Sequence, residues 1–454
     1  MTRPGRAWLA VALLAMLYVV SFVDRLILAL MIEPIKADLA VSDVQIGLLI
    51  GTSFAVFYTL ASIPLARVAD RGDRRVVIVA GATTWGATTA GCAFADSFAI
   101  LLMCRIGVGL GEAALVPAAL SLIADLFPRD RRALPTSIFV TIGACGAAGA
   151  MVVGGLVLHW AETADVSSFP IVAQMAPWRL TLVVVGLPAI GAALAILALV
   201  DEPARTEPPS PERTSLRALT RHVADNRRTY AGFFAAATIT SVLNYSLFAW
   251  FPAHLIRSFD ISPPSVGLLF GGIGVAATLA GGIAIPFLAG ELTRRGYVDA
   301  NMRVSMACVG LAAPLLGGAL LSTDLDLALL CLAPAILLQL GVAVLFVASS
   351  PLLSPGVHRA QMAALFFLFV NLVGFGAGPP LTALIGETIF TGPGAAARAL
   401  AVVVAVFVPV QLAVLWWSLA AFARTYAAAA EEERKTQGHP ASIPPSITNS
   451  APEQ

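Results

Sequence analysis

Residues 66–75 read ARVADRGDRR, a charged turn placed between two long apolar stretches at residues 44–66 and 76–95. Crossing about 30 Å of hydrocarbon at 1.5 Å per residue takes roughly twenty residues of α-helix. Both flanking stretches reach that length. The turn therefore predicts two membrane-spanning helices joined by a short charged connection at the membrane surface.

The rest of the chain repeats this pattern of apolar stretches with charged connections. The 454 residues are 58% hydrophobic and 12% charged, where soluble domains average about a quarter charged. The predicted spans are 8–31, 44–66, 76–95, 99–124, 134–158, 178–200, 230–252, 265–288, 304–322, 327–350, 361–386 and 397–422. We expect an all-α membrane protein with twelve transmembrane helices in two six-helix bundles.

Several other classes of protein are disfavoured by the composition and motifs. The net charge of +1 gives no reason to expect a nucleic-acid partner. The five cysteines have no metal-like spacing, and no catalytic signature or phosphate-binding loop is present. We expect no enzyme activity, no metal and no cofactor.

The basic residues are distributed unevenly between the two sides of the predicted membrane. Of 28 Lys and Arg residues, only Lys36, Arg179, Arg257 and Arg398 lie in connections on the side opposite the N-terminus. By the positive-inside rule, both termini are predicted to be cytoplasmic. An even number of spans agrees with that orientation.

The chain divides into four segments around a polar stretch rich in Arg, Glu and Pro. We predict an N-terminal six-helix bundle at 1–200, a cytoplasmic linker at 201–229, a C-terminal six-helix bundle at 230–424 and a disordered cytoplasmic tail at 425–454. The two bundles repeat each other weakly. Ser42, Gly47, Leu48, Leu49 and Gly51 recur as Ser262, Gly267, Leu268, Leu269 and Gly271, 220 positions later. Both copies lie where the first span of a bundle leads into the second, as in parallel transporter repeats.

Four charged residues lie inside predicted spans and away from the span ends, namely Asp24, Arg25, Arg105 and Glu112. At roughly 2.5–3.5 kcal/mol each, they would cost on the order of 10 kcal/mol if they faced lipid. We expect them to face one another or a wet cavity, which is what a transporter needs. Glu112 is either a titratable switch or a structural ion pair with Arg105, seven residues away on the same helical face. Arg25 either meets substrate or Glu112, or forms a local pair with Asp24.

Spans seven to twelve carry no charge inside the predicted hydrocarbon region and only a few polar side chains. Those taken as candidate substrate ligands, together with Arg25 and Arg105, are Asn244, Tyr245, Gln339 and Asn371. The cavity is therefore expected to be charged on one wall and largely apolar on the other. Such a site suits an amphiphile with an ionic head. For Gln339 and Asn371 the alternative is hydrogen bonding between helices.

The turn at residues 66–75 resembles the cytoplasmic signature of the Major Facilitator Superfamily, G-x-L-A-D-R-x-G-R-R, with Ala66 and Asp73 in place of two glycines. Span four also resembles the superfamily motif R-x-x-x-G-x-G, in its stretch from Arg105 to Gly111. The resemblance implies a cytoplasmic gate that closes when the protein opens outward. Its candidate residues are Asp70, Arg71, Arg74, Arg75 and Asp125. The alternative is that these charges only set the membrane orientation.

Stretches in both halves are similar to the bacterial spinster-like branch of that superfamily. They include SFVDRLIL from Ser21, GEA from Gly111, PWR from Pro177, FAWFP from Phe248 and NLVGFGAGP from Asn371. The resemblance implies proton-coupled movement of lysophospholipids or sphingoid phosphates in a bacterial inner membrane.

The same resemblance suggests roles for the four intramembrane charges. Glu112 and Asp24 would couple protons, and Arg25 and Arg105 would bind the headgroup. The organic anion:cation symporters share the first-span Asp-Arg and the fourth-span Gly-Glu-Ala, so small carboxylates are the alternative substrates. The expected partners are a small amphiphilic or anionic substrate, protons and the lipid bilayer, and we expect a monomer.

Overall fold

The computed structural model describes residues 4–128, 131–169, 173–205, 216–353 and 359–437, and this part of the chain is helical with no strand. The N-terminal half contains α1 (Pro4–Ile27), α3 (Asp43–Gly47), η2 (Leu48–Thr52), α4 (Ser53–Arg71), α5 (Arg74–Cys92), α6 (Phe98–Glu112), α7 (Leu115–Leu126), α8 (Ala133–Thr163) and α9 (Pro177–Leu199). The C-terminal half contains α11 (Arg227–Phe259), α12 (Pro263–Arg294), α13 (Ala300–Leu321), α14 (Leu325–Ser349), η3 (Ser350–Leu353), α15 (Arg359–Phe369), η5 (Val370–Phe375), α16 (Gly376–Ile389) and α17 (Ala395–Gln437). Shorter elements are η1 (Leu28–Leu30), α2 (Ile32–Leu39) and α10 (Leu216–Asp225).

These elements combine into twelve rods, six in each half, because α3–η2–α4, α6–α7 and α15–η5–α16 each form one continuous span. Among the described residues, ten helical rods are long and apolar enough to cross a membrane, and the bent α8 makes eleven. The remaining rod, α5, begins with two arginines and contains several threonines and glycines, yet it packs between α6 and α9. The predicted twelve-helix, two-bundle fold is confirmed.

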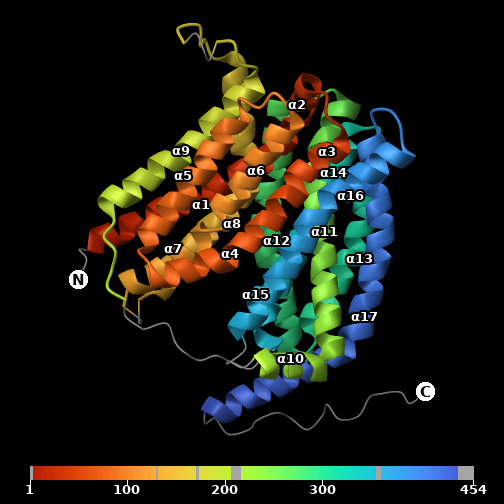
Figure 1. Cartoon of the computed structure of the whole chain (residues 1–454). Helices are drawn as coiled ribbons and strands as arrows, with labels where there is room; N and C mark the ends of the chain where they lie inside the picture. The colour runs from red at the N-terminus through yellow and green to blue at the C-terminus, as the bar shows by residue number, and fades with distance from the viewer. Residues whose placement is uncertain (1–3, 129–130, 170–172, 206–215, 354–358, 438–454) are drawn as a thin grey trace.

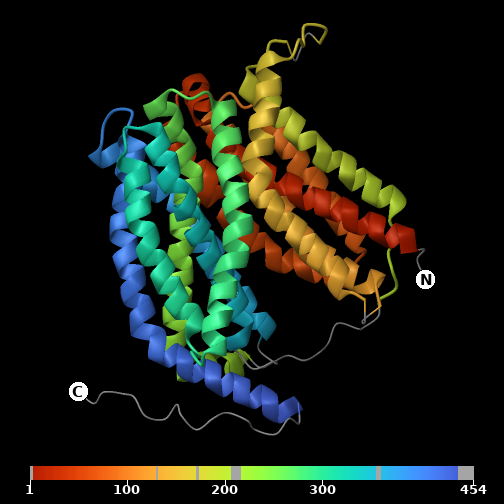
Figure 2. The ribbon, with the colours of Figure 1, turned by 180° about the vertical axis from the view of Figure 1, so that it is seen from behind.

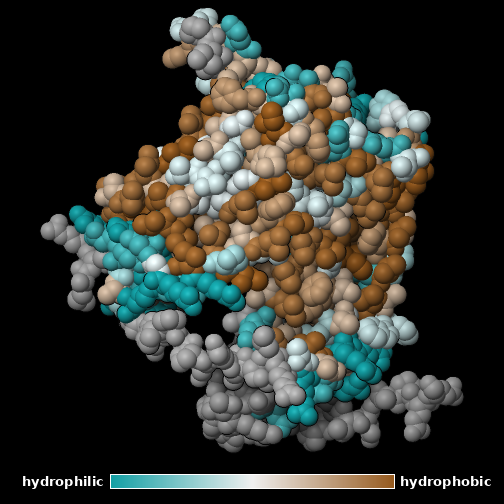
Figure 3. Space-filling view, viewed as in Figure 1, coloured by the Kyte–Doolittle hydropathy of each residue, from teal (hydrophilic) through white to brown (hydrophobic). Residues whose placement is uncertain are grey.

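The two halves meet at one end of the molecule and separate toward the other (Figures 1 and 2). We call the end that carries α2 and α3 the far face, and the end that carries the N-terminus and α10 the N-terminal face. Contacts between the halves join α8 with α12, α3 and η2 with α16, and η1 with α11. The surface is hollowed between the halves at the N-terminal face (Figure 3).

The repeated glycines form the contacts between the halves. A Cβ on Gly47 would lie 2.7 Å from Cα of Pro380, and a Cβ on Gly267 would lie 2.7 Å from Cα of Gly155. Without side chains at these points, the backbones of opposite halves can touch. Each half thus uses the same position of its second rod to pack against the other half.

The linker and the tail differ from the expectation. Within the predicted linker 201–229, α10 forms a helix that lies across the end of the C-terminal bundle (Figure 1), and α11 begins at Arg227. The tail predicted to be disordered from residue 425 is helical as far as Gln437, because α17 continues without a break. The rest of that tail, 438–454, lies outside the described residues, as does the middle of the linker, 206–215.

Candidate functional site

The four charged residues inside the spans are buried together and form two ion pairs between α1 and α6. The Arg25 guanidinium lies 2.6 Å from a Glu112 oxygen, and Nη1 of Arg105 lies 3.0 Å from Oδ1 of Asp24. Each pair joins the two helices, so the possible Arg105–Glu112 and Asp24–Arg25 pairs are both absent from this arrangement. Sequence spacing correctly placed Arg105 and Glu112 in the same buried region, but each of them pairs with a residue of α1.

In the Asp24–Arg105 pair the carboxylate is fully hydrogen-bonded, whereas Nε of Arg105 is buried without a partner among the described residues. The Thr89 hydroxyl on α5 donates to Oδ2 of Asp24 at 2.6 Å, and Nη2 of Arg105 reaches the Asp24 carbonyl at 3.4 Å. Asp24 is 1% exposed and Arg105 is fully buried. Both carboxylate oxygens of Asp24 are therefore satisfied. We infer that the Asp24–Arg105 pair is structural and holds α1, α5 and α6 together.

The Arg25–Glu112 pair is only partly satisfied. Nε of Arg25 and Oε1 of Glu112 are buried without a hydrogen-bond partner among the described residues. The guanidinium lies 4.4, 4.9 and 5.5 Å from the ring centres of Phe54, Phe22 and Tyr58. Aromatic faces stabilise a cation without neutralising it. Arg25 therefore has capacity to bind a second anion.

A cavity of about 290 Å³ lies between the halves beside this pair. Among the described residues, Arg25 is the one charged residue that lines it, and α11 contributes the polar groups Thr240, Ser241, Asn244 and Tyr245. The remaining lining is dominated by apolar side chains of α1, α11, α14 and α15. The cavity thus has a cationic wall and a larger apolar wall, as the distribution of charge along the sequence predicts.

Two of the four polar residues predicted to bind substrate do not line this cavity. Gln339 is 1% exposed within α14, and the adjacent Leu340 faces the cavity in its place. Asn371 lies in the π-helical turn η5, where its amide donates to the Phe367 carbonyl at 2.9 Å. The rotation of each helix about its axis decides which side chains face the cavity. Adjacent residues point about 100° apart, so Leu340 and Val370 line the cavity while Gln339 and Asn371 do not.

The residues missed by the sequence analysis are mostly hydroxyl-bearing side chains, among them Thr89, Thr240, Ser241 and Thr278. One signal for them is the spacing along α11. Thr240, Ser241, Asn244 and Tyr245 occupy positions i, i+1, i+4 and i+5, which is a single helical face. Thr89 has no comparable signal, because α5 carries threonines on several faces.

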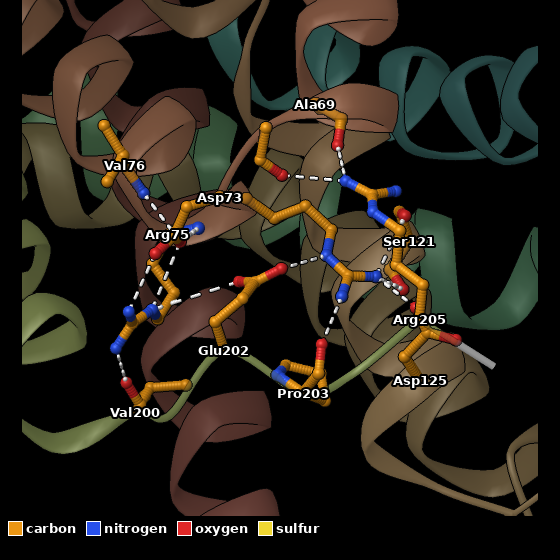
Figure 4. Close-up of polar contacts among 12 residues, drawn as sticks. Ala69, Asp73, Arg75, Val76, Ser121, Asp125, Val200, Glu202, Pro203 and Arg205 are labelled. Carbon is orange, nitrogen blue, oxygen red and sulfur yellow. Dashed lines mark hydrogen bonds and ion pairs between the residues drawn. The ribbon is translucent and has the colours of Figure 1, made fainter. Parts of the chain in front are cut away.

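The charged turn at the N-terminal face is organised around Arg74, whose partners Ser121, Asp125, Glu202 and Pro203 are labelled in Figure 4. This fully buried guanidinium donates to Glu202 at 2.6 Å, to the carbonyls of Ser121 and Pro203, and to Asp125. Asp125 is thus in contact with the turn as predicted, through Arg74. Every one of these partners belongs to the N-terminal half or to the start of the linker.

The other residues of the predicted gate have different environments. Arg75 donates to Asp73 at 2.7 Å and to the Val200 carbonyl, and Asp73 also caps the first turn of α5. The hydrogen bond from Arg75 lowers the pKa of Asp73 from its usual 3.8 to about 2. Asp70 and Arg71 are exposed. Their role in closing the N-terminal face stays a prediction, since the halves are apart there.

The linker is fastened to both halves. Arg205 donates to the carbonyls of Ala69 and Gly72 at the end of α4. On the other side of 206–215, the ring of His222 in α10 lies 2.8 Å from the Tyr230 hydroxyl, which donates to the Leu353 carbonyl. Because that hydroxyl proton is used, the histidine nitrogen is the donor in its bond to Tyr230.

A second charged cluster joins the halves at the far face; we call Glu33, Lys36, Asp43 and Arg257 the far-face cluster. Arg257 of α11 binds both oxygens of Asp43 at 2.8 Å and Oε1 of Glu33 at 2.7 Å. Lys36 lies 2.5 Å from the same Asp43 carboxylate. In addition, Glu387 of α16 accepts from the Val44 amide. All ion pairs found between the halves in the described residues lie in this cluster.

The family profile of the Major Facilitator Superfamily matches residues 14–379. An MFS-type efflux pump of Mycolicibacterium smegmatis is 30% identical over 434 residues, covering 93% of this chain and 94% of the pump. The chain belongs to the Major Facilitator Superfamily of membrane transporters.

Within that superfamily the similarity includes the spinster proteins. Protein spinster of Drosophila melanogaster is 26% identical over 70% of this chain, and human spinster homolog 1 is 30% identical over 56% of it. The chain spans about half the length of these two animal relatives, 51% and 47% respectively. The predicted resemblance to spinster-like transporters is confirmed.

The fold agrees with solved structures of the same type. A bacterial homolog of the human lysosomal transporter Spinster, solved in an inward-facing and unoccupied conformation, superposes with a TM-score of 0.78. The match covers 94% of this chain and 99% of that one at 24% identity. The nucleoside transporter NupG superposes with a TM-score of 0.68 at 14% identity.

Proposed function

We propose that this protein is a proton-coupled secondary transporter that works by alternating access and moves an amphiphilic anion of the lysophospholipid or sphingoid-phosphate type. We place it in a bacterial inner membrane with both termini, and hence the N-terminal face, in the cytoplasm. The excess of Arg on that face supports this orientation. The separation of the halves at the same face then corresponds to an inward-facing state.

The observation that carries the proposal is that a single charged residue lines the cavity within the described part of the chain. Arg25 presents a guanidinium with unused donors to a space that is otherwise mostly apolar. A guanidinium binds phosphate or carboxylate through paired hydrogen bonds. The apolar wall accommodates a hydrocarbon tail, and this favours an amphiphile over the small carboxylates of the alternative assignment.

Proton coupling is assigned to Glu112, because its carboxylate balances the charge of Arg25. When Glu112 is ionised, the pair is electrically neutral and has little affinity for an anion. Protonation at Oε1, which is unpaired, removes the negative charge and leaves Arg25 to bind the substrate headgroup. Substrate and Glu112 thus compete for Arg25. Asp24, held by Thr89 and Arg105, serves mainly to keep Arg105 in place.

The test is transport into proteoliposomes under an imposed pH gradient. With Glu112→Gln, uptake of a labelled lysophospholipid should no longer respond to the gradient, while exchange between labelled and unlabelled substrate continues. Glu162→Gln, the same change at an exposed residue of α8, is the matched control and should behave as the unaltered protein. Glu112→Asp keeps the acid and should retain part of the response.

Two results would overturn the assignment. Gradient-driven uptake that persists in Glu112→Gln would exclude this residue as the coupling group. Uptake of a small dicarboxylate by the unaltered protein, with no uptake of the labelled lysophospholipid, would exclude the amphiphile as the substrate. Unchanged thermal melting of the purified variants shows that loss of transport is not loss of folding.

A further inference from the structure

An apolar groove of about 630 Å³ runs along the outer surface of the N-terminal half between α4, α5 and the α6–α7 rod. We call it the α4–α5 groove; its walls include Leu60, Pro64, Val68, Val76 and Leu110. These residues face outward and away from the transport cavity. The volume lies within the range of ordinary ligand pockets.

The floor of the groove includes Gly81 and Gly111, which have no side chains. A Cβ on Gly81 of α5 would lie 2.6 Å from the Gly111 carbonyl oxygen of α6, so these two helices touch through their backbones. The walls stand above this floor, and Leu60, Val68 and Val76 are each more than half exposed. In a membrane, such a groove must be filled by hydrocarbon.

The end of the groove at the N-terminal face is positively charged. Arg67 and Arg71 follow Leu60 and Pro64 on the same face of α4, at the spacing of successive helical turns. Both are exposed, and neither forms a hydrogen bond or ion pair with any residue in the described ranges. Their neighbours Arg74 and Arg75, in contrast, are fully engaged. Asp70, also exposed, is the one acidic residue between them.

A third guanidinium adds to this charge. Arg205 binds the last carbonyls of α4, at Ala69 and Gly72, with distances of 2.8 and 2.7 Å. Arg74 and Arg75 are paired with Asp73, Asp125 and Glu202. With Arg67, Arg71, Arg205 and Asp70 included, five arginines face four carboxylates at this end, so a net positive charge remains. The groove therefore has an apolar channel in the membrane and a cationic end at the membrane surface.

We propose that the α4–α5 groove binds an anionic phospholipid of the leaflet at the N-terminal face. One acyl chain lies in the groove, and the phosphate is held by Arg67 and Arg71. Basic pockets between membrane helices on the cytoplasmic side recognise anionic lipid headgroups, and paired guanidinium groups suit phosphate. The site is separate from the cavity, so its existence does not depend on which substrate is transported.

The test measures lipid binding to the purified full-length chain by native mass spectrometry. The two lipids compared are phosphatidylglycerol and phosphatidylcholine with the same acyl chains. We expect the unaltered protein to prefer phosphatidylglycerol, and the double variant Arg67→Gln/Arg71→Gln to bind it at least tenfold more weakly. Ala80→Phe, which fills the groove, should weaken binding of both lipids. Arg294→Gln/Arg295→Gln, with the same loss of charge at exposed positions in the other half, is the matched control.

Three outcomes would overturn the proposal. These are equal binding of the two lipids, phosphatidylglycerol binding that survives the Arg67 and Arg71 changes, and loss of the preference in the control variant. If only Ala80→Phe weakens phosphatidylglycerol binding, the groove binds acyl chains without recognising the headgroup, and the proposal is wrong. Glu112→Gln should bind phosphatidylglycerol normally, so failure of this proposal is distinct from failure of the transport proposal.

Discussion

The far-face cluster should hold the halves together at that face, and Arg257→Gln tests this directly. The substitution removes the bidentate contact with Asp43 and the contact with Glu33, which are made only while the far face is closed. Truncating one partner of a buried, hydrogen-bonded charge pair costs about 2–5 kcal/mol. Arg257 and Asp43 are 13% and 16% exposed and Glu33 is 36% exposed, so we take the lower limit of about 2 kcal/mol. That energy corresponds to about a 30-fold shift toward the state with an open far face.

The shift can be measured as a distance distribution across the far face. Spin labels at Ala40 and Thr391, which are exposed on opposite halves, report the separation by pulsed electron resonance in a cysteine-free background. The long-distance population should rise about 30-fold relative to the short one in Arg257→Gln. Asp326→Asn, the loss of one charge at an exposed residue in the first turn of α14, should leave the distribution unchanged.

A charge exchange strengthens the test. In Arg257→Asp/Asp43→Arg, the two groups regain an ion pair of reversed polarity, and the short-distance population should partly return. Neighbouring Glu33 and Lys36 are then beside charges of their own sign, so recovery is incomplete. A distribution in Arg257→Gln that matches the unaltered protein would refute the reasoning that this cluster stabilises the closed far face.

Three further outcomes are expected. Gly267→Val should destabilise the protein by about 1–3 kcal/mol, because the added Cβ would lie 2.7 Å from the backbone of α8. Gly272 faces open space, so in a thermal scan Gly272→Val should melt at nearly the same temperature as the unaltered protein. Thr89→Val should cost about 1–2 kcal/mol by leaving one Asp24 oxygen without its donor, and an unchanged melting temperature would contradict this. The lowered pKa of Asp73 makes its ionised form stabilising. The unaltered protein should therefore melt at a higher temperature than Asp73→Asn above pH 4. This difference in melting temperature should disappear as the pH falls from 3.8 to about 2. A difference that stays constant over this pH range would refute the prediction.

The positions of the rods could be predicted because hydrocarbon imposes a minimum length on every apolar helix. The predicted spans agree with the observed rods within a few residues at most ends. The extension of α17 to Gln437 was not anticipated, since a run of Ala and Glu outside the membrane is compatible with either helix or disorder. The helix α2 was missed because it has only eight residues. The helix α10 carries Leu216, Leu219 and Val223 at helical spacing, a signal that the Arg, Glu and Pro content of the linker obscured.

The pairing of side chains could be predicted only in part. Spacing along one helix places Arg105 and Glu112 on a common face, but it does not say which residues of other helices face them. The same limit explains Gln339, whose helix is rotated so that Leu340 faces the cavity. Arg257 and Asp43, 214 positions apart, carry no local signal. Their one clue was the scarcity of basic residues on the far face.

The anchoring of the linker to both halves sets an upper limit on how far they can move. Arg205 is fixed against α4, and α10 is fixed against α11 through the His222–Tyr230 contact. Only residues 206–215 connect these points, and a chain of that length reaches at most roughly 40 Å even when fully extended. The number of residues in this segment therefore limits the distance between the two anchor points, and an insertion there would raise that limit without altering any contact described above.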